Sequence, residues 1–219
     1  MRYAGAQWIP VSNFSSGLDG RMSAHLGLIL HTQQGNGSPR GWFNNPQSEA
    51  SSHFWVGKDG TAQQFVDTDQ RAWAQALGNT SYLSVECEGF VTEPLTAKQI
   101  GALADLFAWG MFTYSFPKRL AERPGQMGLG WHGMGGVAWG DHPGCPGDLR
   151  KAQRGAVLAL INGGDWFDMA TKDELKAAIR EVLAEQVIQN DDGPGKISVL
   201  TALYRAYSQS RKAVLKLGA

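Results

Sequence analysis

The segment from Trp131 to Arg150 contains the side chains of this sequence that are best suited to metal chemistry. It holds two of the five histidines, His132 and His142, and one of the two cysteines, Cys145. Its glycines and prolines predict a long loop and not a helix or strand. Imidazole and thiolate are both good ligands for zinc, so we expect His132 and Cys145 to bind a zinc ion.

A zinc ion that catalyses hydrolysis needs three protein ligands and one open coordination position. His31 ends the apolar run of residues 26–30, which predicts a buried central strand, and loop-forming residues follow it. His31, His132 and Cys145 therefore form the predicted ligand set. His142 is an alternative to His132 as a ligand, and His31 has a second interpretation as a cap of its strand.

A carboxylate suited to such a centre lies on a second predicted strand. Residues 83–88 alternate apolar and polar side chains, which places Cys87 on an apolar face and Glu86 and Glu88 on the opposite face. Cys87 is then a small buried hydrophobic residue, with a metal thiolate as the less favoured alternative. Beside a metal, Glu86 could take a proton from water and return it to a leaving nitrogen, so it is the predicted catalytic residue.

Several other elements are predicted to hold these residues in place. The runs 52–56 and 61–66 flank an Asp-Gly turn, which indicates a β-hairpin. His53 shares a strand face with Trp55 and is expected to pack at the sheet surface. Apolar residues at helical spacing predict a helix over residues 96–113. Residues 1–24 are expected to be irregular, and residues 117–130 to form a connection.

A further helix is predicted from Asp148 to Ile161, preceded by a proline that suits a first turn. Its apolar residues are expected to face the core and its cationic residues the solvent: inward Leu149, Ala152, Val157, Leu158 and Ile161, outward Arg150, Lys151 and Arg154. From Thr171 onward, two apolar stripes predict a helical hairpin. We therefore expect a catalytic domain over 1–165 and a helical tail over 166–219, which serves docking or homo-oligomerisation.

The composition argues against several classes of protein. Twenty basic residues balance twenty acidic ones without a long run of either sign, so no nucleic-acid partner is expected. No apolar run reaches the ~18 residues of a membrane span, so membrane insertion is not expected. The first residues lack the apolar core of a signal peptide, which predicts cytoplasmic synthesis. Two cysteines in 219 residues do not make a disulfide framework.

Several motifs along the chain resemble those of the type-2 N-acetylmuramoyl-L-alanine amidases. This zinc amidase family also contains peptidoglycan recognition proteins and phage lysozyme-type endolysins. The similar pieces are Leu28-Ile29-Leu30-His31, the hairpin 52–60, Trp73, Asn79, the strand 84–89, Gly130-Trp131-His132 and Cys145-Pro146-Gly147-Asp148-Leu149. They cover residues 25–162 in the family's order. The chain departs from the pattern at Ser52, where many members have Tyr, and at Pro143, where many have Lys or Thr.

The resemblance implies an α/β fold in which helices flank a mixed central β-sheet. It also implies site residues by role: zinc on His31, His132 and Cys145, catalysis by Glu86, and substrate binding by Trp73, Asn79 and His53. The implied activity is hydrolysis of the amide between N-acetylmuramic acid and L-alanine in bacterial peptidoglycan. Since no signal peptide is expected, the leading hypothesis is a phage or prophage endolysin that reaches the cell wall after release by a separate lysis protein. The alternatives are a non-catalytic peptidoglycan-binding module and a zinc domain that regulates a protein partner. For the tail 166–219, this resemblance adds wall attachment to the expected roles.

Overall fold

The structure is a computed structural model that describes residues 1–161 of the chain. The strands in this range are β1 (Gln7–Trp8), β2 (Phe14–Ser15), β3 (Gly27–Thr32), β4 (Phe54–Val56), β5 (Ala62–Gln64), β6 (Arg71–Ala72), β7 (Leu83–Cys87) and β8 (Gly128–Trp131). The α-helices are α1 (Arg40–Phe43), α2 (Ala97–Tyr114) and α3 (Asp148–Leu160), and the 3-10 helices are η1 (Pro46–Ser48), η2 (Ala76–Thr80) and η3 (His132–Trp139). Met1–Ile161 form one compact unit. The predicted helical tail, and oligomerisation through it, lie outside the described residues.

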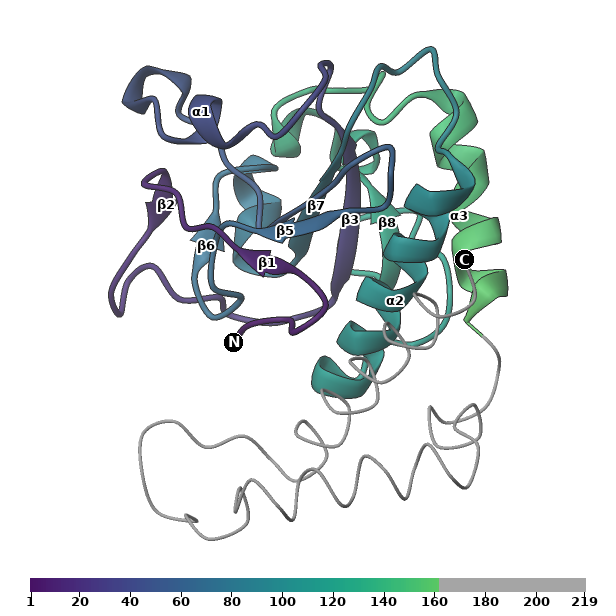
Figure 1. Ribbon diagram of the computed structural model, residues 1–219. Coiled ribbons are helices and arrows are strands. Elements are labelled where there is room, and N and C mark those ends of the chain that lie inside the picture. The colour runs from purple at the N-terminus through teal and green to yellow at the C-terminus, as the bar shows by residue number, and fades with distance from the viewer. Residues whose placement is uncertain (162–219) are drawn as a thin grey trace, which may run out of the picture. The chain divides into compact units, whose positions relative to one another are not determined.

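Six of the strands form one mixed sheet in the order β1-β5-β4-β7-β3-β8 (Figure 1). The four strands β4, β7, β3 and β8 run parallel to one another, whereas β5 pairs antiparallel with β4. Helix α2 packs against β3 and β4, and α3 lies beside α2. The separate strands β2 and β6 form a small antiparallel pair. The predicted mixed sheet flanked by helices is thus confirmed.

The central strand β3 is buried along its whole length, as predicted. Ile29 belongs to a core cluster with Trp139 of η3, whereas Thr32 bonds to Arg150 of α3 on the other side of the sheet. Because successive side chains of a strand point to opposite faces, His31 shares the face of Ile29. That face is covered by the 3-10 helices and not by α2 and α3.

Three further predicted elements are confirmed. Strands β4 and β5 form the antiparallel hairpin, and β7 carries the alternating residues, with Cys87 fully buried. Helix α2 begins after Thr96, whose side chain accepts a hydrogen bond from the backbone N–H of Gln99 in a capping box. Although α2 has 18 residues, no helix in the described range is long and apolar enough to cross a membrane.

The sequence prediction was wrong where glycine-rich or very short strands occur. The expected connection 117–130 and loop 131–150 contain β8 and η3, and the segment 1–24 contains β1 and β2. Strand β8 pairs with β3 so that Gly27 lies opposite Gly128, and a Cβ atom at Gly27 would be only 1.9 Å from the Gly128 carbonyl oxygen. Glycine is therefore required for this close approach, and it also conceals the strand pattern.

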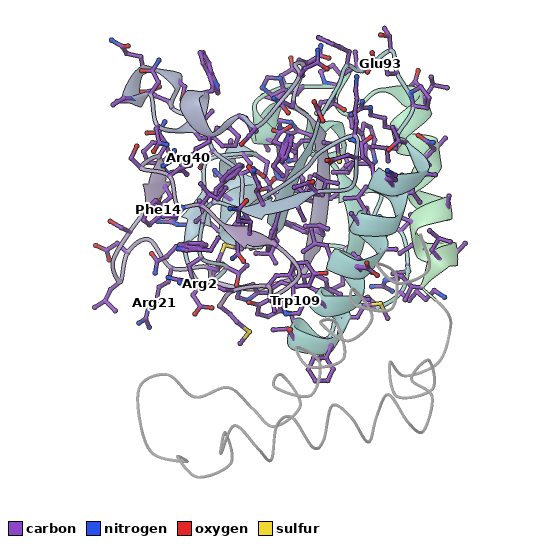
Figure 2. All side chains as sticks on the ribbon, in the orientation of Figure 1. Arg2, Phe14, Arg21, Arg40, Glu93 and Trp109 are labelled. Atoms are coloured by element: carbon purple, nitrogen blue, oxygen red, sulfur yellow. The ribbon has the colours of Figure 1, made fainter. Side chains whose placement is uncertain are left out.

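The predicted orientation of α3 was partly wrong. Leu149 is 51% exposed, whereas Arg150 and Arg154 are 0% and 2% exposed. The guanidinium of Arg150 donates hydrogen bonds of 2.8–3.2 Å to four oxygen atoms, the carbonyls of Cys87, Glu88 and Glu93 and the hydroxyl of Thr32. Glu93 lies at the end of the molecule where α3 begins (Figure 2). Because an arginine has five N–H donors, it can bond to several buried oxygen atoms at once, which explains why these cationic side chains face inward.

We expect Arg150→Met to destabilise the fold by about 3–5 kcal/mol, because it removes four hydrogen bonds that a buried charged group makes inside the fold. Urea unfolding of the full chain measures this change. The matched control is Arg123→Met at an exposed position, with an expected change below about 0.5 kcal/mol. Equal midpoints for the two variants would show that the hydrogen bonds of Arg150 do not stabilise the protein.

Candidate active site

The register of three neighbouring parallel strands brings His31, Glu86 and His132 to one edge of the sheet. In the β3–β7 pair, His31 lies opposite Glu86. In the β3–β8 pair, Leu30 lies opposite Trp131, so His132 follows directly at the end of β8. The carboxyl ends of parallel strands form the edge where ligands bind in open α/β sheets. Three residues that are far apart in sequence therefore meet there.

Cys145 reaches the same edge from the segment between η3 and α3. Its N–H donates to the His142 carbonyl at 3.1 Å, and its own carbonyl accepts from the Gly133 N–H at 3.0 Å. The Cys145 sulfur accepts from the N–H of Thr32 at 3.5 Å. After a cis peptide bond, the Pro146 carbonyl accepts from the Thr32 hydroxyl at 2.7 Å. These contacts tie the cysteine to the end of β3.

His31, His132 and Cys145 together form a candidate metal centre. One ligand atom from each lies within 4.8 Å of the others, and the two imidazole rings are 4.3 Å apart. Within residues 1–161, no other set of three His, Cys, Asp or Glu side chains comes close enough to hold a metal. His142 is not in this set, although its ring lies 4.7 Å from that of His132.

The Nε2 atoms of His31 and His132 each form a hydrogen bond within the protein. Nε2 of His132 lies 2.9 Å from the carbonyl oxygen of Trp139. Since a carbonyl can only accept, this nitrogen carries a proton, and Nδ1 of His132 keeps a free lone pair. Nε2 of His31 lies 2.8 Å from the side-chain oxygen of Gln75. Hydrogen bonds of this kind orient the histidine ligands of metal sites.

Burial controls the protonation of the three candidate ligands. It lowers the pKa of His132 to about 4, and burial followed by the neighbouring His132 places the pKa of His31 well below its usual value. Both imidazoles are therefore neutral near pH 7, which is the form that binds metals. Burial, and then the nearby Glu86, raise the pKa of the Cys145 thiol to about 12. A metal that binds here must displace that proton.

Glu86 is positioned for proton transfer beside these ligands. Its Oε1 lies 3.9 Å from Nδ1 of His31, and its Oε2 is buried with no hydrogen-bond partner in the described part of the protein. Burial raises the pKa of Glu86 to about 8, although the positive charge of Arg150 acts in the opposite direction. A carboxyl group with a pKa near neutrality can both take up and release a proton.

These groups line a cleft of about 540 Å³, which extends over Gln34, Asp141, His142 and Pro143. Gln34 and Asp141 both have a φ of 57°, a strained conformation for residues other than glycine that is common at ligand sites. Of the two positions that depart from the family pattern, Pro143 lines the cleft, whereas Ser52 is fully buried. The cleft therefore combines the candidate ligands, a carboxyl group and space for a substrate.

The structure does not bring His53, Trp73 and Asn79 into the lining of this cleft. His53 is 1% exposed, deeper than the sheet surface where it was expected. Its ring nitrogens lie 3.0 Å from the Ser84 hydroxyl and 2.9 Å from the Gln70 carbonyl. The side chains of Trp73 and Asn79 also form hydrogen bonds within the fold. A role of the three residues in substrate binding stays a prediction.

Gln75 is a site residue that sequence reasoning missed. It precedes η2 in a turn-rich stretch, where a polar residue is usually exposed, yet it is 1% exposed and contacts His31. No local pattern in the sequence could have revealed it, because its burial depends on the packing of η2 against η3.

Comparisons with known proteins agree with this geometry. Residues 21–148 match the family model described as N-acetylmuramoyl-L-alanine amidase. Among similar solved structures, the endolysine N-acetylmuramoyl-L-alanine amidase LysCS from Clostridium intestinale is 17% identical, with 72% of this chain and 95% of that chain covered and a TM-score of 0.51. The Staphylococcus aureus hydrolase AmiA is 20% identical, with 72% and 81% covered and a TM-score of 0.55. PlyL is 18% identical, with 73% and 98% covered and a TM-score of 0.54. At these identities the likeness shows a shared fold, and no curated protein matches the chain.

Proposed function

Because the chain belongs to the N-acetylmuramoyl-L-alanine amidase family, we propose that it cleaves the amide between N-acetylmuramic acid and L-alanine in peptidoglycan with a zinc ion. The observation that carries this proposal is the convergence of His31, His132 and Cys145 within 4.8 Å beside Glu86. A binding module has no need of a carboxyl group with a raised pKa next to a metal centre, so this arrangement favours an enzyme over a non-catalytic module.

The donor set fits zinc. Two neutral imidazoles and one thiolate match the ligands of catalytic zinc sites, which keep a further position open. The hydrogen bonds on the Nε2 atoms of His31 and His132 supply the supporting contacts that such ligands usually have. When bound, the ion would supply Lewis acidity, which polarises a carbonyl group and lowers the pKa of water. His31, His132 and Cys145 would hold it.

Glu86 would carry the proton transfers of the reaction. Its buried carboxylate takes a proton from the attacking water as the new C–O bond forms at the amide carbon. It then delivers this proton to the leaving nitrogen as the C–N bond breaks, which releases a peptide with a free amino-terminal alanine. The free Oε2 of Glu86 is available for this exchange, since no group in the described part of the chain occupies it.

The proposed reaction is tested with purified bacterial cell walls. We expect the protein to release stem peptides whose only new amino terminus is alanine, which an amine-reactive label followed by hydrolysis identifies. Wall material that retains bound protein but gains no new amino termini would instead support the non-catalytic binding module. New termini of any other residue would contradict the assignment of the cleaved bond.

We propose in addition that the enzyme acts as a phage or prophage endolysin. The support for this proposal is that a solved structure of similar fold is described as an endolysine N-acetylmuramoyl-L-alanine amidase. Expression in a susceptible bacterium should cause lysis only when a membrane-permeabilising protein is expressed with it. Lysis by the protein alone would contradict a dependence on separate release.

The affinity for zinc should rise about tenfold per pH unit between pH 5.5 and 7.5. In this range His132, with a pKa of about 4, is already neutral, whereas Cys145, with a pKa of about 12, must lose one proton for each ion bound. Competition with a chromophoric chelator measures the slope. Repeating the titration with Glu86→Gln removes the carboxyl group beside the candidate ligands, and a slope near zero in that variant would show that the thiolate is not a ligand.

A further inference from the structure

We propose that Gln75 is a positioning residue that fixes His31 as the tautomer protonated on Nε2 and thereby presents Nδ1 to the metal. This inference rests on the proposed metal centre, but it concerns a residue outside the ligand set. The metal can bind only the nitrogen that lacks a proton. The identity of that nitrogen in His31 therefore decides whether the site is ready to bind.

The orientation of the Gln75 side chain follows from its other partners. Its amide nitrogen lies 3.1 Å from the carbonyl oxygen of Tyr82 and 3.4 Å from that of Gly78. Both carbonyls can only accept, so the NH₂ group must face them and the side-chain oxygen must face His31. That oxygen also can only accept, and Nε2 of His31 at 2.8 Å must therefore donate. The tautomer is thus set by two main-chain carbonyls, that of Gly78 in η2 and that of Tyr82 just before β7.

Asn79 holds the segment in the shape that presents Gln75. Its side-chain oxygen accepts from the N–H groups of Ala74 and Gln75 at 3.0 and 2.7 Å. Ala76, which follows Gln75 in the chain, has a φ of 43°. This backbone conformation costs free energy in any residue other than glycine. This strain persists because the surrounding hydrogen bonds determine the turn. Asn79 therefore acts on the site through Gln75.

The same segment also supports the second histidine. A Cβ atom at Gly78 would lie 2.6 Å from the Trp139 ring and 2.7 Å from Gln75, so this glycine lets η2 pack directly on η3. Trp139 supplies the carbonyl that accepts from Nε2 of His132. The packed pair of η2 and η3 thus orients both imidazole rings through their Nε2 atoms, which leaves each Nδ1 atom for the metal. Such preorganisation favours metal binding because no ring must change its tautomer or turn on binding.

The first measurement is the tautomer of His31, read from the ring ¹⁵N shifts of the labelled, metal-free full chain. We expect the Nε2-protonated form alone in the wild type and a mixture of tautomers in Gln75→Ala. The second measurement is zinc affinity, which should fall about 10- to 100-fold in Gln75→Ala and Gln75→Met. Asn79→Ala should weaken zinc binding in the same direction by a smaller factor.

Gln64→Ala is the matched control, since Gln64 is equally buried and its amide bonds to main-chain groups elsewhere in the fold. It should keep the tautomer of His31 and a zinc affinity within about twofold of the wild type. An Nδ1-protonated His31 in the wild type, or unchanged zinc affinity in both Gln75 variants, would overturn the proposal. Neither measurement involves peptidoglycan. A protein with the expected tautomer of His31 but no amidase activity would therefore refute the proposed function and leave the proposal for Gln75 intact.

Discussion

Replacement of Cys145 by serine is expected to weaken zinc binding and, after dialysis has removed the more weakly bound ion, to abolish amide hydrolysis. Zinc binding in structural protein sites is worth about 10–16 kcal/mol, so the loss of one ligand should cost about 3–4 kcal/mol, or 10²- to 10³-fold in affinity. A serine hydroxyl does not ionise near neutral pH, and it is therefore a poor substitute for the thiolate as a zinc ligand. Metal content after dialysis and the rate of peptide release from cell walls measure the two effects.

The second cysteine provides the control for this variant. Cys87 is fully buried and its chain position lies next to Glu86, but it is not part of the metal set. Cys87→Ala should therefore retain zinc and most of the activity, with a stability loss of about 1 kcal/mol from the smaller side chain. The opposite pattern, in which Cys87→Ala loses zinc and Cys145→Ser retains it, would show that the wrong thiol was assigned to the metal.

Glu86→Gln should lower kcat by about 10²- to 10⁴-fold while zinc affinity changes little, because an amide of the same shape cannot accept and return a proton. The sign of the pH dependence follows from burial. Burial raises the pKa of Glu86 to about 8, and a bound dication would lower it. The rate should therefore rise with pH up to a pKa no higher than about 8. In the variant this limb should be absent from the pH profile of the residual rate.

Glu88→Gln is the matched control, since Glu88 follows on the same predicted strand face. Its two oxygens accept hydrogen bonds of 2.7 Å from the N–H groups of Gly37 and Lys58, and it does not line the cleft. This variant should keep kcat within a few-fold of the wild type. If both variants lose activity equally, or if Glu86→Gln loses its zinc, proton transfer by Glu86 would be contradicted.

The parts of the site that lie on strands could be predicted from the sequence because period-two alternation is a local signal. The apolar run before His31 and the alternation around Glu86 place each residue on its face without knowledge of the rest of the fold. The pairing of β3 with β7 then brings these two residues together. A shift of one residue in either strand would have placed His31 or Glu86 on the opposite face of the sheet, which α2 covers.

The parts that could not be predicted depend on contacts between distant segments. Gly128 and Gly27 allow two strands to approach closely, and their lack of side chains removes the pattern that would reveal β8. The burial of Arg150 depends on carbonyl groups more than fifty residues away in the chain. The spacing to Cys145 favours neither His132 nor His142, and only the family resemblance indicated His132, which the structure places in the candidate metal set.

The most direct test of a zinc-dependent site is a zinc titration of the metal-free full chain, in which each step is followed by the initial rate of release of peptides with amino-terminal alanine from purified cell walls. We expect no release without metal and a rate that rises linearly to a plateau at one zinc ion per chain. Full release before zinc is added, or no release from a protein that has bound one equivalent, would contradict a zinc-dependent amidase centred on His31, His132 and Cys145.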